Sequence, residues 1–181
     1  MEKSLASQPS AAEKVRHTYK ITPDLEDRAA LRNVLQFATD IGFFATGVTL
    51  ACGWPGKVWM YLFNEPNPWE GEWKGESGHV LDVAYMFQNY DEHLTQAQQA
   101  VAKAFAGDFI SFMNRKTRWP EFESGKEGAM TYGPSGDGKC SEYVEGITSE
   151  KSGRKNTIFE LAESVGMEDL SAAWGNFLSG N

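Results

Sequence analysis

A short apolar run at residues 58–63, VWMYLF, is the feature that most constrains the fold of this chain. The run is rich in residues that favour strands and has no polar position, whereas a strand with one face in solvent alternates polar and apolar side chains. The segments before and after it show helical spacing or turn residues. We therefore expect a strand buried on both faces, in a mainly parallel sheet covered by helices. The pattern predicts an α/β architecture.

The first half of the chain is otherwise predicted to be mainly helical. A hydroxyl, a proline and an acid at residues 22–24 form a typical helix start, and apolar side chains then recur at helical spacing to Ala38. Asp40 is expected to cap a second helix over residues 41–52. A long loop over residues 64–75, rich in Pro, Asn and Trp, follows the strand, and loops of this length are often functional.

The second half combines helices with one weaker strand. Residues 81–90 are expected to be helical, and Thr95 and Gln98 form a capping box that opens a helix to about residue 113. Residues 127–132 are a weaker strand candidate, and residues 133–153 are expected to be an irregular loop. Another capping box at residues 157–160 predicts two short helices, whose apolar positions are Leu161, Val165, Leu170, Trp174, Phe177 and Leu178.

Length and composition predict one domain with an ordinary core. The chain has 181 residues, of which 41% are hydrophobic and 23% charged. Residues 1–10 are polar and expected to be loose, so the domain is expected to span residues 11–181. The formal net charge of −8 argues against nucleic acid and against anionic membrane surfaces as partners.

No targeting or membrane-spanning signal is recognised in the sequence. The first ten residues lack the apolar core of a signal peptide, and no apolar stretch is judged long enough to cross a bilayer, so a soluble cytoplasmic protein is expected. Two cysteines, Cys52 and Cys140, do not form a disulfide framework, and nothing local indicates that they pair.

Neither a metal nor a cofactor is expected. The three histidines are scattered, and no closely spaced ligand pair is present. Residues 133–139 match the start of a phosphate loop, G-x-x-x-x-G-K, but Cys140 stands where Ser or Thr should bind Mg²⁺. With a weak preceding strand, no helix signal after it and a negative net charge, a nucleotide site is not expected.

His79 is the main candidate for chemistry. It follows the predicted strand and the long loop and precedes the predicted helix at residues 81–90. A residue in that position can point into a cleft at the carboxyl end of a strand, where ligands bind in α/β sheets. Histidine is also the usual general base. The alternative is a histidine on a surface loop without function.

Four stretches in this order resemble the C-terminal region of fungal type B carboxylesterases, relatives of the cholinesterases and lipases. They are VLQFATDI at residues 34–41, FNEPNPW at 63–69, GHVLDVAYMFQN at 78–89 and WPEF at 119–122. The resemblance extends from about residue 12 to about residue 134. It implies the C-terminal portion of an α/β-hydrolase, mostly helical with one or two strands of the sheet, and a carboxylic ester as substrate.

The resemblance also implies roles for particular residues. Gly78-His79 matches the catalytic histidine of the family, and Asp82 matches a supporting position that usually holds a buried acid. The family's triad acid lies farther upstream of the histidine than this chain readily allows. Glu65, Trp69 and Trp73 are possible residues of the pocket rim, although solvated loop positions for the glutamate and core packing for the tryptophans are the simpler interpretations.

The nucleophile and the oxyanion hole are not found in the sequence. Ser77 and Ser135 each lie in a Gly-x-Ser-Gly context that lacks the last glycine of a Gly-x-Ser-x-Gly elbow, and no two glycines are adjacent. We therefore expect a C-terminal fragment of a serine esterase that carries only the catalytic histidine and is inactive alone. The alternative is a non-catalytic interaction module derived from an α/β-hydrolase, which could self-associate through an exposed strand edge.

Overall fold

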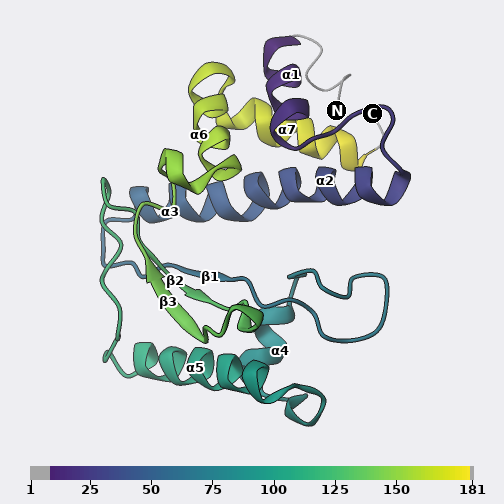
Figure 1. Ribbon diagram of the computed structural model, residues 1–181. Helices are drawn as coiled ribbons and strands as arrows, with labels where there is room; N and C mark the ends of the chain where they lie inside the picture. The colour runs from purple at the N-terminus through teal and green to yellow at the C-terminus, as the bar shows by residue number, and fades with distance from the viewer. Residues whose placement is uncertain (1–8, 180–181) are drawn as a thin grey trace. The chain divides into compact units, whose positions relative to one another are not determined.

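The computed structural model describes residues 9–179, except for the side chains of residues 151, 173 and 176–178. The chain has a mixed α/β fold with a small three-stranded sheet (Figure 1). It divides into two compact units, where the sequence predicts one domain. Unit 1 contains the described parts of Met1–Gly53 and Gly146–Asn181, and unit 2 is Trp54–Glu145.

Unit 1 is helical. Its elements are α1 (Pro9–Thr18), α2 (Asp27–Thr39), the π-helical η1 (Asp40–Ala45), α3 (Thr46–Gly53), the short η4 (Glu150–Ser152), α6 (Arg154–Val165) and α7 (Met167–Leu178). The core joins residues from the two ends of the chain, because α1, α2 and η1 pack against α6 and α7 through Val15, Phe37, Ile41, Ile158, Leu161 and Leu170. Leu161 and Leu170 are buried as predicted, whereas the side chains of Phe177 and Leu178 lie outside the described part.

Several predicted boundaries in unit 1 are wrong. Residues 1–8 lie outside the described part, but Pro9 and Ser10, expected to be loose, already belong to α1. Helix α2 begins at Asp27 with Glu26 as N-cap, later than the start predicted at residues 22–24. Helix α6 begins at Arg154 and not at the capping box predicted for residues 157–160.

Asp40 does not cap a new helix, because α2, η1 and α3 follow one another without interruption (Figure 1). Its carboxylate is buried and accepts hydrogen bonds from the Tyr19 hydroxyl at 3.0 Å and from Arg154 Nε at 2.9 Å. Two partners from distant segments satisfy the acid inside the unit. The helix therefore continues past a residue that would otherwise favour a helix start.

The continuous helix over Asp27–Gly53 is long and apolar enough to cross a membrane by length and composition, with a mean hydropathy of 1.4 in its most apolar window. The sequence prediction that no stretch reaches that length is therefore wrong. Core helices of soluble proteins pass the same test, and 44% of the window is buried inside the protein.

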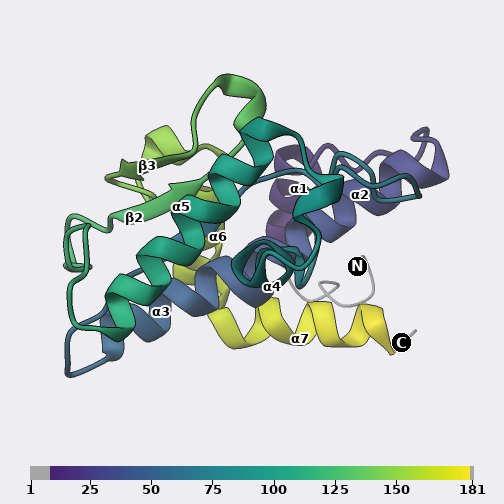
Figure 2. The ribbon, with the colours of Figure 1, turned by 90° about the horizontal axis from the view of Figure 1, so that it is seen from below.

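Unit 2 contains the sheet and two main helices. Its elements are β1 (Tyr61–Phe63), α4 (Leu81–Phe87), η2 (Asp91–His93), α5 (Gln96–Met113), β2 (Ala129–Tyr132), η3 (Ser135–Asp137) and β3 (Ser141–Val144). The strand order is β1-β2-β3, with β1 parallel and β3 antiparallel to β2. Helix α5 lies below the sheet in Figure 1 and crosses it in the view of Figure 2, and its buried residues Val101, Ala102 and Phe105 pack against Met130 and Tyr132 of β2.

The predicted strand at residues 58–63 is shorter and more exposed than expected. Only Tyr61–Phe63 form β1, which lies at one end of the sheet. Tyr61 is 39% exposed, so the expectation of burial on both faces is wrong. Residues 58–60, before β1, still form hydrogen bonds with later segments of unit 2. The Val58 carbonyl accepts one from Phe122 N, and the Met60 carbonyl accepts one from Met130 N.

The other predictions for unit 2 are mostly confirmed. Helix α4 and strand β2 lie within the predicted segments, and Thr95 and Gln98 form the predicted capping box of α5. The exception is β3, which lies in the segment predicted to be an irregular loop. Only Tyr143 of this edge strand is half-buried and its other side chains are exposed, so the strand has little apolar signal.

Candidate functional site

His79 lies on the turn that leads into α4, and its side chain is exposed. The hydroxyl of Ser77, two residues earlier, donates a hydrogen bond to the carbonyl of Phe63 at 2.9 Å. Phe63 is the last residue of β1, which pairs in parallel with β2. The long loop after β1 therefore returns to the carboxyl end of this strand immediately before His79. In parallel sheets, ligands bind at this end of the strands.

The backbone beside His79 is strained. Val80 has a φ of 65°, in the left-handed region, and a β-branched residue rarely adopts it. The side chain of Val80 is 52% exposed, so burial of the isopropyl group does not account for the conformation. Strained residues persist where the surrounding structure holds them, and they concentrate at functional sites.

Asp82 is half-buried in the first turn of α4, three residues after His79. Its Oδ2 accepts a hydrogen bond from the Tyr61 hydroxyl at 2.9 Å, and its Oδ1 accepts one from Val83 N. The pKa of Tyr61 is raised to about 12, mainly by burial and to a lesser extent by the hydrogen bond to Asp82 and the negative charge of Asp82. Asp82 therefore joins the first turn of α4 to strand β1.

Glu65 is completely buried, so the simpler expectation of a solvated loop carboxylate is wrong. Its two carboxylate oxygens accept hydrogen bonds from Ser135, one from the backbone N–H at 2.7 Å and one from the hydroxyl at 2.6 Å. Glu65 follows β1 and Ser135 follows β2, so the contact joins the two loops at the carboxyl ends of the parallel strands. Gly133 packs so closely on Glu65 that an added Cβ would lie 2.5 Å from its carboxylate.

Tyr85 of α4 lies near this buried carboxylate. Burial, and secondly the negative charge of Glu65, raise the pKa of Tyr85 well above its ordinary range. Its hydroxyl is buried and has no hydrogen-bond partner in the part of the chain that the structure describes. Sequence reasoning missed both Ser135 and Tyr85 as neighbours of Glu65. The one available signal was the turn-forming sequence Gly133-Pro134-Ser135 directly after a strand candidate.

The two tryptophans expected near a pocket rim lie in different environments. Trp69 is half-buried and packs edge-on against Tyr90, with ring centroids 5.3 Å apart, beside the core of unit 2. Trp73 is 39% exposed on the long loop. Neither tryptophan, nor Glu65, lines the aromatic pocket between α5 and the sheet.

The segment resembling a phosphate loop, the two cysteines and the metal-ligating residue types form no binding site in the described part of the chain. The segment resembling a phosphate loop leads into strand β3 and not into a helix, so it does not present a helix N-terminus to a phosphate. Cys52 and Cys140 are both free and exposed. Within residues 9–179, no group of three or more His, Cys, Asp or Glu side chains is placed to hold a metal ion.

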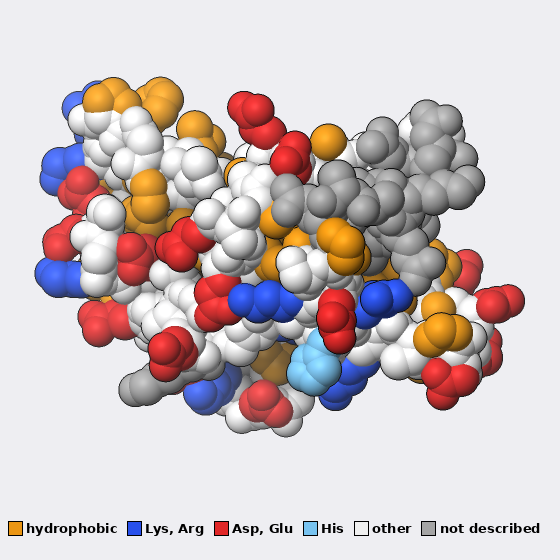
Figure 3. All heavy atoms as spheres, turned by 90° about the horizontal axis from the view of Figure 1, so that it is seen from above, with side chains coloured by type: hydrophobic (Ala, Val, Ile, Leu, Met, Phe, Trp, Pro, Cys, Tyr) orange, Lys and Arg blue, Asp and Glu red, His pale blue; other side chains and the backbone are white. Residues whose placement is uncertain are grey.

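Acidic and basic side chains are interspersed on the face seen in Figure 3, together with scattered apolar groups. This face carries no broad basic patch of the kind that binds nucleic acid. The observation agrees with the negative net charge, and it applies to the described side chains on that face alone.

Comparisons with known proteins find no matching family model, no similar curated protein and no similar solved structure. The resemblance to fungal type B carboxylesterases therefore rests on the four sequence stretches alone.

Proposed function

We propose that this chain is the C-terminal part of a carboxylesterase-type serine hydrolase and that His79 is its catalytic general base. The observation that carries the proposal is the position of His79, exposed on a turn that Ser77 attaches to the carboxyl end of β1. The proposal also assigns the chain to the α/β-hydrolase fold. The parallel pair β1–β2 would be part of a larger α/β-hydrolase sheet, to which the open side of β1 would join.

The proposed reaction is hydrolysis of a carboxylic ester by acyl transfer. A serine from polypeptide outside residues 1–181 attacks the ester carbonyl, and the His79 imidazole takes the serine proton. The imidazole then protonates the leaving alcohol as the tetrahedral intermediate collapses to an acyl-enzyme, which water hydrolyses with His79 again as base. Asp82 holds the turn of His79 in place through its hydrogen bond to Tyr61, as a positioning residue.

The proposal predicts that the chain alone has negligible esterase activity, because the nucleophile and the oxyanion hole are the larger part of the machinery. The first experiment measures hydrolysis of p-nitrophenyl butyrate by the isolated chain and by its His79→Ala variant. Both should hydrolyse the ester at the background rate. Turnover by the isolated chain that His79→Ala abolishes would show that the nucleophile lies within these residues.

The second experiment tests the role of His79 directly. The chain is combined with the N-terminal part of a fungal type B carboxylesterase, truncated before its own catalytic histidine. The proposal predicts that the wild-type chain restores turnover and that His79→Ala lowers the restored rate by about a thousandfold or more. His93→Ala is the matched control, because His93 is also exposed in unit 2 and should leave the restored rate unchanged. Equal restoration by His79→Ala and the wild type would contradict the proposal.

The alternative function is a non-catalytic interaction module. The observation in its favour is that β1 lies at the end of the sheet, where its outer side can pair with a strand of another chain. Such a module should self-associate or bind an apolar dye. A monodisperse monomer that binds no dye would count against it, and an open reading frame with a Gly-x-Ser-x-Gly elbow upstream of Met1 would favour the esterase fragment.

A further inference from the structure

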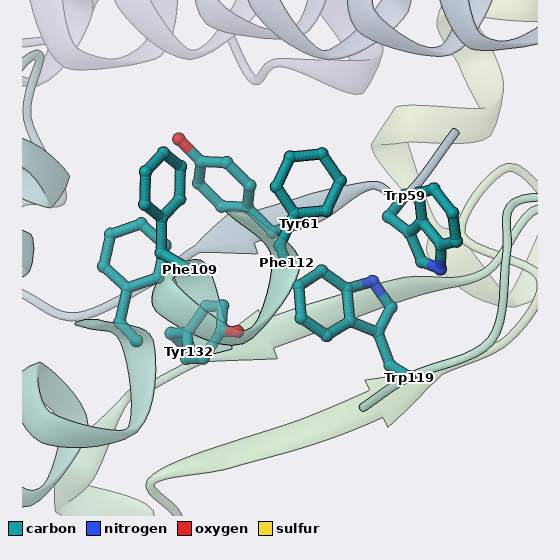
Figure 4. Close-up of a pocket in the computed structure, with 7 residues that line it drawn as sticks. Trp59, Tyr61, Phe109, Phe112, Trp119 and Tyr132 are labelled. Atoms are coloured by element: carbon teal, nitrogen blue, oxygen red, sulfur yellow. The ribbon is translucent and has the colours of Figure 1, made fainter. Parts of the chain in front are cut away.

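A pocket of about 100 Å³ lies inside unit 2, between α5 and the sheet, and its lining consists of aromatic side chains (Figure 4). Helix α5 contributes Phe105, Phe109 and Phe112, and the strand side contributes Trp59 and Tyr61. An engineered apolar cavity of about 150 Å³ binds benzene, and this pocket has about two-thirds of that volume, so a single ring can enter it with part of the ring left outside. Phe109 and Phe112 are 37% and 42% exposed, which leaves the pocket accessible from solvent.

The tyrosine hydroxyls around the pocket already have partners. The Tyr61 hydroxyl donates to Asp82 at 2.9 Å, and the Tyr132 hydroxyl donates to Asp108 at 3.0 Å. A ligand would therefore meet the rings of these residues, while their polar ends remain engaged with carboxylates. The two carboxylates behind the rings also disfavour an anionic ligand.

Trp119 is different, because its polar atom has no partner. The residue lines the pocket and is 9% exposed, and its indole Nε1 is buried without a hydrogen bond in the described structure. Figure 4 shows this nitrogen on the edge of the indole that is turned toward Phe112 and Trp59. A buried N–H without an acceptor costs about 1–3 kcal/mol, and a ligand atom that accepts its hydrogen bond would remove this cost.

The unpaired atom also selects the class of ligand. An indole nitrogen is a donor only, so it needs an acceptor atom on the ligand. Aromatic cages that bind quaternary ammonium groups present ring faces to a cation, and a donor N–H directed at the ligand works against that use.

We propose that this pocket is a binding site for a small, neutral aromatic carbonyl compound. The ring of the ligand lies among the aromatic side chains, and its carbonyl oxygen accepts a hydrogen bond from Trp119 Nε1. The proposal is independent of the esterase proposal, since His79 is not among the residues that line the pocket.

The test compares two probes of nearly the same shape, acetophenone and α-methylstyrene, in which a carbonyl oxygen is replaced by a methylene group. Each is titrated into the full chain while the indole N–H signals are followed by NMR, and the Trp119→Phe variant identifies the signal of Trp119. Acetophenone should shift the Trp119 indole proton downfield in a saturable manner, and α-methylstyrene should not.

Affinities measured for the same pair give a second readout. In Trp119→Phe the preference for acetophenone over α-methylstyrene should fall about fivefold, the equivalent of one net hydrogen bond of about 1 kcal/mol. Trp73→Phe, the same substitution at a tryptophan outside the pocket, should leave the preference unchanged. Phe112→Leu should weaken both probes alike, because it removes ring contact and leaves the donor in place.

Three results would overturn the proposal. Absence of saturable binding by either probe at millimolar concentration would show that the pocket is a packing gap. Equal indole shifts with both probes would show that the N–H takes no part in binding. Displacement of acetophenone by tetramethylammonium at lower concentration would assign the pocket to cations. If Trp119→Phe fails to fold, the indole shifts of the wild-type chain still decide among these outcomes.

Discussion

The carboxylate of Glu65 accepts both the backbone N–H and the hydroxyl of Ser135, a residue 70 positions farther along the chain. The contact joins the loop after β1 to the loop after β2. It places a completely buried carboxylate at the carboxyl ends of β1 and β2, and Ser77 attaches the turn of His79 to the same end of β1. The loop that carries His79 is therefore anchored at its start by Glu65 and close to its end by Ser77.

This anchor should be important for stability. Glu65→Ala removes the acceptor of two hydrogen bonds and leaves the Ser135 N–H without its partner, so we expect the free energy of unfolding to fall by about 2–3 kcal/mol. Urea denaturation measures the change. Glu70→Ala, on the same loop with an 87% exposed side chain, is the control and should change stability by less than about 0.5 kcal/mol. A similar small change for Glu65→Ala would mean that the buried carboxylate does not stabilise the fold.

Arg154 should be similarly important in unit 1. Arg154→Met removes the ion pair between Arg154 and the buried Asp40, while the Tyr19 hydroxyl remains. The Arg154 side chain is 42% exposed, so the expected loss in the free energy of unfolding is below the range of about 3–5 kcal/mol for a fully buried pair, at about 1–3 kcal/mol. Lys14→Met breaks the exposed Lys14–Glu160 pair and should have little effect. If both variants lose the same free energy of unfolding, the burial of Asp40 does not account for the loss in Arg154→Met.

The strain at Val80 can be measured with one substitution at two positions. Val80→Gly places the residue that best tolerates a positive φ at the strained turn, so we expect stability to rise by about 0.5–1 kcal/mol. Val83→Gly, in α4 three residues later, should instead lower stability by about 1 kcal/mol, because glycine is unfavourable within a helix. Thermal or urea unfolding measures whether each variant gains or loses stability. A loss at Val80 as large as that at Val83 would show that the turn is not strained.

Alkaline pH should destabilise the protein through Tyr61, which is partly buried. Burial and the Asp82 carboxylate raise the pKa of Tyr61 from 10.0 to about 12, so its contribution is complete below pH 10, where the unfolded chain also keeps the phenol protonated. Above pH 10 the unfolded state releases the proton first, and the contribution falls until about pH 12. Urea unfolding midpoints measured from pH 8 to 12 should fall between about pH 10 and 12, and they should fall less steeply in Tyr61→Phe.

Asp82→Asn gives a separate check of the same contact. Removing the negative charge should lower the pKa of Tyr61, although burial, the larger cause, should keep it above 10.0. Absorbance of tyrosinate during a pH titration, with Tyr61→Phe as reference, follows this one hydroxyl. An unchanged titration would mean that Asp82 and Tyr61 do not interact in solution.

Much of the secondary structure could be predicted from local patterns. The capping box of Thr95 and Gln98 begins α5 as expected, and the apolar segments mark β2 and α4. These signals depend on residues within a few positions of one another, so a single sequence contains them. Prediction failed where a distant partner overrides the local preference. Asp40 is the example, because Arg154, 114 positions away, satisfies its carboxylate within a continuous helix.

The same distinction applies to the candidate site. The sequence alone determined that His79 follows a strand candidate and a long loop, and that Asp82 lies one helical turn later. The tertiary structure decided that His79 is exposed beside the end of β1, that Asp82 bonds to Tyr61 and that Glu65 is buried against Ser135. It also assembled Trp119 and six other phenylalanine, tyrosine and tryptophan rings around one pocket. These relations join residues tens of positions apart, and folding brings them together through burial and hydrogen bonding that no local periodicity records.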